Sequence, residues 1–334
     1  MSRETLEWLN TNVLIGHTDK RGKAWHYRSS TQGVEPNHYS GPIPIADVQR
    51  RLFHWHVESG PVLVQAGRHG LVRADNRQAL YADDTGEVLG VFAESYAIHQ
   101  YQDWLLDKVA SILDDNLSIG SAGLLRNRAQ AWVSVEIPEN ITTREGVTFR
   151  PNLLACTSHD GSLATTYKRV VTNVVCDNTM SAGLTETGQV IKIKHSRYSA
   201  FRVLDARKAL DMVMAVADDF AAEVAQLCRV GVSDSVWRQF LTAHVPDGDS
   251  SRSKTLAHTE RAELDRLWNF DERVRPWRNT GWGVVQAVNT YTHHYATVRG
   301  ASRPERNLCR AVAGQTDALD LATVTTLDKV LAAA

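Results

Sequence analysis

Apolar residues recur along this chain with two different periods, and the change of period predicts where strands give way to helices. Between about residues 121 and 196, apolar blocks of strand length are separated by Gly, Asp, Asn or Pro, which predicts at least four strands. A helical repeat over about residues 99–115 precedes them, and from about Leu204 onward helical stripes follow. We therefore expect an α+β fold: a strand-rich antiparallel core with a packed helix, followed by a helical C-terminal region.

Local signals add detail to this outline. The stretch 45–57 predicts a short helix whose Val48, Leu52 and Trp55 share one face. Asp and Gly at residues 84–86 indicate a hairpin turn, and the polar stretch 247–254 is typical of a linker. The predicted divisions are an N-terminal α/β segment over residues 1–87, a β-rich core with one helix over residues 88–203, and a helical region over residues 204–334.

The composition is that of a chain with a sizeable core, since 43% of its 334 residues are hydrophobic. No apolar stretch approaches the roughly 20 residues that span a bilayer, and the N-terminal residues carry charges where a signal peptide has an apolar block. We expect a cytoplasmic protein without a membrane partner. Its four cysteines lie far apart without a CxxC pair, which favours reduced thiols.

The formal net charge of −1 conceals a segregated pattern. Residues 150–208 carry nine Lys and Arg against four Asp and Glu, whereas residues 209–275 carry eight against twelve. The central strands are therefore basic and the first half of the helical region is acidic, a distribution that leaves room for a polyanionic partner.

The loop SHDGS presents the first candidate chemistry. His159 as general base and Asp160 as its orienting carboxylate, with Asn178 nearby, would suit a hydrolase. Neighbouring side chains usually diverge, however, and Asp-Gly is typical of a turn in which His159 and Ser162 bond the loop backbone. His293 and His294 point about 100° apart on a helix, which predicts surface positions rather than a shared ligand.

A metal or nucleotide cofactor has little support in the sequence. Cys156, His159, Cys176 and His195 carry zinc-binding groups, but they lack the tight pairs that structural zinc sites show. No phosphate-binding loop, dinucleotide fingerprint or GxSxG serine elbow is present. We expect no cofactor and no bound metal.

The stretch QVIKIKHSRYSAFR alternates strictly, so that Lys192 and Lys194 lie on one side and Ile191 and Ile193 on the other. Single-stranded nucleic acid binds where cations meet phosphates and aromatic rings stack on bases. The predicted nucleic-acid-binding residues are Lys168, Arg169, Lys192, Lys194, Arg197 and Tyr198. A solvated strand edge whose lysines prevent aggregation explains the same pattern equally well.

Three blocks of this region resemble a known family. The SHDGS turn at Ser158–Ser162, the block Val174–Thr179 and the IKHS strand end at Ile193–Ser196 are similar, in order, to motifs of phage- and plasmid-like proteins with domain of unknown function 932. The resemblance covers about residues 88–331, and the stretch LNTNVLIGHTDKRGKAWHYR at residues 9–28 resembles the start of members from actinobacterial phages. Asn173 stands where the family commonly has an arginine, and Arg169 lies upstream of that position.

The resemblance implies a mobile-element setting, and by analogy it suggests phage annealing recombinases. We expect a non-enzymatic DNA-binding protein that binds single-stranded DNA in recombination or replication, as a homo-oligomer with a possible protein partner at its helical region. The alternatives are a metal-assisted nuclease or hydrolase that uses His159, Asp160 and Asn178, and a protein-interaction factor such as an inhibitor of a host defence enzyme.

Overall fold

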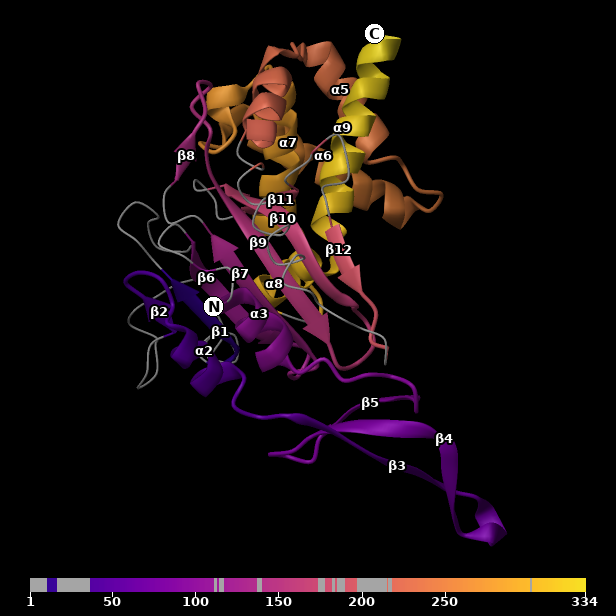
Figure 1. Ribbon diagram of the computed structural model, residues 1–334. Helices are drawn as coiled ribbons and strands as arrows, with labels where there is room; N and C mark the ends of the chain where they lie inside the picture. The colour runs from indigo at the N-terminus through magenta and orange to yellow at the C-terminus, as the bar shows by residue number, and fades with distance from the viewer. Residues whose placement is uncertain are drawn as a thin grey trace. The chain divides into compact units, whose positions relative to one another are not determined.

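A computed structural model gives the fold of the chain (Figure 1). It describes residues 11–16, 37–110, 113, 117–136, 140–173, 178–181, 184, 190–196, 215, 218–300 and 302–334. The chain forms two compact units, each made from three separate stretches. Unit 1 consists of Met1–Pro138, Asn152–Arg169 and Gln189–Met214, and unit 2 consists of Glu139–Pro151, Val170–Gly188 and Ala215–Ala334.

A large sheet forms the centre of unit 1. Its strands in the described residues are β1 (Val13–Gly16), β2 (His38–Tyr39), β6 (Ser118–Leu125), β7 (Gln130–Glu136), β9 (Thr148–Ser158), β10 (Thr165–Asn173) and β12 (Val190–Ile193). They lie in the order β2-β1-β6-β7-β9-β10-β12, and β1 pairs with β2 in parallel, whereas β6, β7, β9, β10 and β12 take part in antiparallel pairs. Strands β9 and β10 continue into unit 2, where they pair with β8 (Ile141–Thr142) and β11 (Asn178–Ser181).

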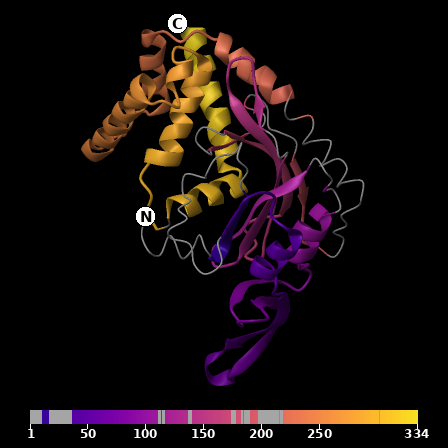
Figure 2. The ribbon, with the colours of Figure 1, turned by 90° about the vertical axis from the view of Figure 1, so that its left-hand side faces the viewer.

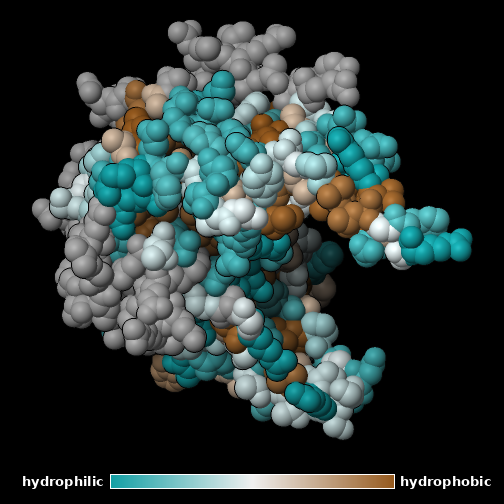
Figure 3. All heavy atoms as spheres, turned by 90° about the horizontal axis from the view of Figure 1, so that it is seen from below, coloured by the Kyte–Doolittle hydropathy of each residue, from teal (hydrophilic) through white to brown (hydrophobic). Residues whose placement is uncertain are grey.

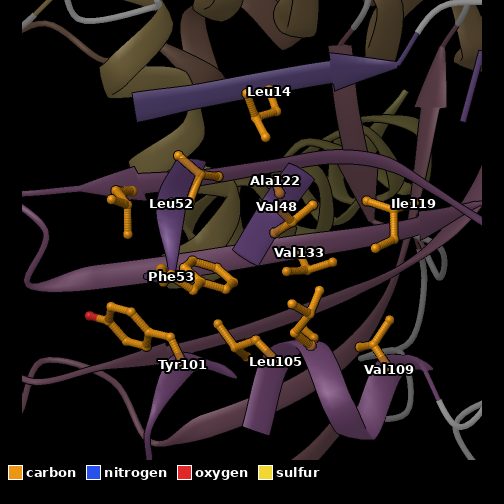
Figure 4. Close-up of a cluster of buried hydrophobic side chains, with 14 of the residues drawn as sticks. Leu14, Val48, Leu52, Phe53, Tyr101, Leu105, Val109, Ile119, Ala122 and Val133 are labelled. Atoms are coloured by element: carbon orange, nitrogen blue, oxygen red, sulfur yellow. The ribbon is translucent and has the colours of Figure 1, made fainter. Parts of the chain in front are cut away.

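Short helices pack on this sheet and close the core of unit 1 (Figure 4). They are α2 (Ile45–Leu52), the π-helix η3 (Gln102–Asp107) and α3 (Lys108–Ala110). Val48, Leu52 and Trp55 are buried as the sequence predicts, because the apolar face of α2 meets β6. Leu105 and Val109 are fully buried in the same cluster.

A second sheet of three antiparallel strands belongs to unit 1: β3 (Val57–Gln65), β4 (Leu71–Ala82) and β5 (Val88–Ala93). The β4–β5 turn contains Gly86 at φ +71°, which confirms the hairpin predicted at residues 84–86. The short η2 (Gly67–His69) joins β3 to β4. Beyond the end that packs on the core, the strands form a projecting ribbon with exposed hydrophobic side chains (Figures 1 and 3).

Unit 2 is mostly helical, and its helices run from orange to yellow in Figure 2. They are α5 (Asp234–His244), α6 (Ser251–Phe270), η4 (Arg275–Trp277), α7 (Gly281–Thr290), the π-helix η5 (Tyr291–Tyr295), α8 (Arg303–Ala313) and α9 (Gln315–Ala333). Helix α7 is buried at every position, and the rings of Trp237 and Trp268 stack at 4.4 Å between α5 and α6. The α+β fold class predicted from the sequence is confirmed.

One local prediction is wrong. The stretch 247–254 is not a linker throughout, because α6 begins at Ser251. Ser250 and Ser253 form a reciprocal capping box, in which each side chain accepts from the backbone N–H of the other. These serines satisfy the free N–H groups of the first turn, so a polar run that resembles a linker starts a helix of 20 residues.

Candidate functional site

Four of the six predicted residues, all of them cations, lie on or directly after two strands that pair with each other. In the register of β10 and β12, Thr166 faces Lys192 and Lys168 faces Val190, so Lys168 and Lys192 share one face of the sheet. Lys192 and Lys194 are exposed, whereas Lys168 is only 3% exposed. Arg169 follows Lys168 in β10 and therefore lies on the opposite face.

The other predicted residues are less informative. Arg197 and Tyr198 lie outside the described residues. Tyr167, an aromatic neighbour of the cations, is 2% exposed and its hydroxyl donates to Trp104 O, so its ring is unavailable to a base. The structure thus brings Lys168, Lys192 and Lys194 to one side and separates Arg169 from them.

The other face of the same strands carries a stack of five rings, here called the ring stack. Its members in order are Phe92, Tyr96, His195, His99 and Trp104. Successive ring centroids lie 4.1, 4.9, 4.0 and 3.9 Å apart, with interplanar angles of 22° or less. Aromatic contacts of this kind contribute roughly 0.5–1.5 kcal/mol each beyond area burial.

Two buried threonine hydroxyls join the histidines of the ring stack. Thr165 Oγ1 lies 2.6 Å from His99 Nδ1 and 2.8 Å from Thr157 Oγ1, which in turn lies 3.0 Å from His195 Nε2. His195 Nδ1 donates to Ala97 O at 3.2 Å. These bonds connect β9, β10 and the end of β12 with the segment before η3, so the network fixes the relative positions of four chain segments.

His159 lies close to this network but takes no part in it. The residue is 0% exposed, and neither ring nitrogen has a hydrogen-bond partner among the described residues. Its ring stacks on Tyr101 at 4.1 Å and lies edge-on to Trp55 at 6.3 Å. The sequence predicts that His159 bonds the loop backbone, and for its side chain this is wrong, because aromatic packing holds the imidazole inside the core.

The three imidazoles are neutral at physiological pH. Burial lowers the pKa of His99 and of His159 to about 3, with a smaller effect from neighbouring histidines. Burial also lowers the pKa of His195 to about 4, against the opposing effect of its bond to Ala97. A general base works best with a pKa near the operating pH and within reach of its substrate. The cluster meets neither condition in this conformation.

Asp160 has its own partners on the surface side of the loop. Its Oδ1 accepts from Ser162 N at 2.9 Å, its Oδ2 lies 3.7 Å from Arg126, and Gly161 adopts φ +75°. The predicted turn at Asp160 is therefore present. Its carboxylate has partners other than the His159 ring, as expected for neighbouring side chains that diverge, and the side chain of Asn178 is outside the described part of β11.

A metal centre finds no support in the described residues, which contain no group of three or more His, Cys, Asp or Glu side chains that could hold an ion. Cys156, Cys228 and Cys309 take part in no disulfide bond within the described ranges. His159 and His195, which the sequence groups only as carriers of zinc-binding side chains, lie near enough to influence each other electrostatically. No spacing signal linked His195 to His99, since the stacking of their rings depends on strand register.

None of the described helices combines the length and the apolar character that a membrane span needs.

A search of curated proteins and a search of solved structures each returned no match. The family model described as domain of unknown function 932 matches residues 88–313, which include every residue of the ring stack and the basic strands. The chain therefore belongs to the family of proteins that contain domain of unknown function 932.

Proposed function

We propose that this protein is a non-enzymatic DNA-binding protein of phage or prophage origin, which holds single-stranded DNA during recombination or replication. The observation that carries the proposal is the pair of exposed cations Lys192, in β12, and Lys194, directly after it; Lys168 in β10 shares the face of Lys192 but is buried. The buried, neutral histidines favour a structural role for the opposite face.

The spacing of these cations suits a nucleic-acid backbone. Residues two apart in a strand are separated by roughly 6.6 Å, since a strand rises about 3.3 Å per residue. Phosphates of a stacked DNA strand follow each other at roughly 3.4 Å along the axis, so the two lysines span about two phosphates. Such contacts carry no sequence information, as expected of a protein that holds any single strand.

Fluorescence anisotropy with a labelled 30-nucleotide thymidine oligomer, measured from 50 to 300 mM NaCl, tests the proposal. Removal of two phosphate contacts by Lys192→Gln with Lys194→Gln should lower the slope of log affinity against log salt by about 1.4. The matched control is Lys254→Gln with Lys329→Gln, two exposed lysines of α6 and α9. No binding at 50 mM NaCl, or equal losses in both double variants, would refute the proposal.

A second function is favoured by the projecting ribbon of β3 and β4. Leu63, Val64, Leu71 and Val72 are 45–67% exposed, and contiguous apolar surface of this kind often marks a protein-binding site. Figure 3 shows hydrophobic side chains gathered along this projection. A protein-interaction factor, such as an inhibitor of a host defence enzyme, would lose capture of its partner in Leu63→Ser with Leu71→Ser and would retain its affinity for DNA.

A further inference from the structure

A cavity of about 430 Å³ opens within the helical part of unit 2. Its wall is formed by residues of α5, α6, α7, η5, α8 and α9, or directly beside them, and includes Glu260, Tyr291, His293 and Arg310. The volume falls in the range of roughly 300–1,000 Å³ that is usual for small-molecule sites. Charged groups of both signs together with an aromatic ring make it a candidate binding site.

Helix α8 contributes Arg310 to the cavity wall, and two further arginines lie on the same side of this helix. Arg303, Arg306 and Arg310 follow each other at intervals of three and four residues and so lie on one side of the helix. Burial first, and then the charges of Arg310 and Arg303, together lower the pKa of Arg306 to about 10. Within the described residues none of the three forms an ion pair with a carboxylate.

Two of these arginines donate hydrogen bonds to backbone carbonyl groups. Arg303 donates to Ala296 O at 2.9 Å, and Arg306 donates to Thr292 O and Ala296 O at the C-terminal end of η5. Arg310 differs, because it lines the cavity and has no such bond among the described residues. A guanidinium in this position is suited to an anionic group of a ligand, since charge-assisted hydrogen bonds are the stronger class.

The wall formed by α6 and η5 includes an acidic side chain and an aromatic ring. Burial raises the pKa of Glu260, and burial together with the charge of Glu260 raises the pKa of Tyr291. Both residues line the same cavity, so the carboxylate and the phenol ring face a common space. Together they present a hydrogen-bond acceptor beside an aromatic face, which is the combination that recognises a flat ring with an amino group.

The π-helix η5 positions one further group. His293 is 5% exposed and lines the cavity, so the prediction that it lies at the surface is wrong. Asn307 Nδ2 donates to His293 O at 3.0 Å and ties η5 to α8. Single π-turns occur frequently at functional sites, because the wider turn re-aims side chains that an α-helix would direct elsewhere.

We propose that this cavity binds a nucleotide, with the phosphate at Arg310, the base against Tyr291, and an amino group of the base donating to Glu260. The inference does not depend on DNA binding by β12, because every group in it belongs to unit 2. It adds a nucleotide-binding site to the proposed function. The nucleotide is either free or the terminal nucleotide of a DNA strand, and competition with an oligonucleotide that carries a 5′-phosphate distinguishes the two.

Isothermal titration of the full chain with dCMP, dTMP, deoxycytidine and inorganic phosphate tests the proposal. Deoxycytidine and phosphate alone should each bind at least ten-fold more weakly than dCMP. Arg310→Gln should weaken dCMP binding at least ten-fold, while Arg299→Gln, an exposed arginine outside the cavity, should leave it within two-fold. Glu260→Met should weaken dCMP at least five-fold and change dTMP less than two-fold, because thymine has no amino group.

Several results would overturn the proposal. Absence of dCMP binding at millimolar concentration excludes a nucleotide site, and phosphate that binds as tightly as dCMP indicates a plain anion site instead. The comparison of dCMP with deoxycytidine uses the unmutated chain, so it decides the matter even where a variant fails to fold. An oligonucleotide with a 5′-phosphate that competes with dCMP identifies a strand end, and one that does not compete identifies the free nucleotide.

Discussion

Replacement of His159 by phenylalanine should stabilise the protein. The imidazole is fully buried, and neither of its ring nitrogens has a partner in the part of the chain that the structure describes; an unsatisfied buried polar group costs roughly 1–3 kcal/mol. Phenylalanine keeps a ring against Tyr101 and removes those nitrogens. We therefore expect the free energy of unfolding at pH 7 to rise by about 1–3 kcal/mol. His159→Ala should instead lower it by about 2–4 kcal/mol, because it leaves a cavity.

The same replacement should change the response to acid. The pKa of His159 is about 3 in the folded chain and 6.5 in the unfolded chain. Above pH 6.5 both forms are neutral, and as the pH falls toward 3 only the unfolded chain takes up the proton, so stability is lost. From pH 7 to pH 4.5 this one residue accounts for a loss of about 2.5 kcal/mol, which His159→Phe should abolish.

Urea unfolding followed by tryptophan fluorescence at pH 7.0, 5.5 and 4.5 measures both effects. His258→Gln, at an exposed position of α6, is the control and should reproduce the wild-type pH dependence. If His159→Phe is destabilised at pH 7 and keeps the wild-type acid response, the His159 imidazole is hydrogen-bonded in the folded protein and the predicted stabilisation is refuted. If His159→Ala folds but loses turnover of DNA, the hydrolase alternative is correct.

Two further substitutions test other parts of the molecule by the same urea measurement. Thr165→Val should lower the free energy of unfolding by about 2–3 kcal/mol, because it leaves His99 and the Thr157 hydroxyl short of a buried partner; Thr165→Ser keeps the hydroxyl and should cost less. Ser233→Ala should cost about 1 kcal/mol, since Ser233 Oγ caps α5 by accepting from Val236 N at 3.2 Å, and an unchanged midpoint would contradict that role.

The parts of the fold that the sequence predicted correctly are those that depend on local residue patterns. Val48 and Leu52 are buried because a helical period alone decides which face of α2 meets the core. The hairpin at residues 84–86 likewise follows from Gly86, whose positive φ is a property of one residue. The alternation of Lys192 with Ile191 and Ile193 likewise indicates which residues share a face of β12, whichever strand pairs with it.

Local residue patterns do not predict the ring stack. His195 meets His99 because β12 pairs with β10 in one register, and a shift by one residue would send His195 to the other face. His293 was misjudged for a related reason, since the expectation assumed an α-helix and η5 is a π-helix. Both features arise from long-range packing, which residue periods do not encode.

The interleaving of the two units along the chain limits how this protein can be divided. The backbone passes between the units five times, so any fragment that includes all of unit 1 or all of unit 2 also carries pieces of the other. Strands β9 and β10 each contribute residues to both. No single crossover between relatives can therefore exchange one unit whole and leave the other intact, and the two are expected to be inherited together.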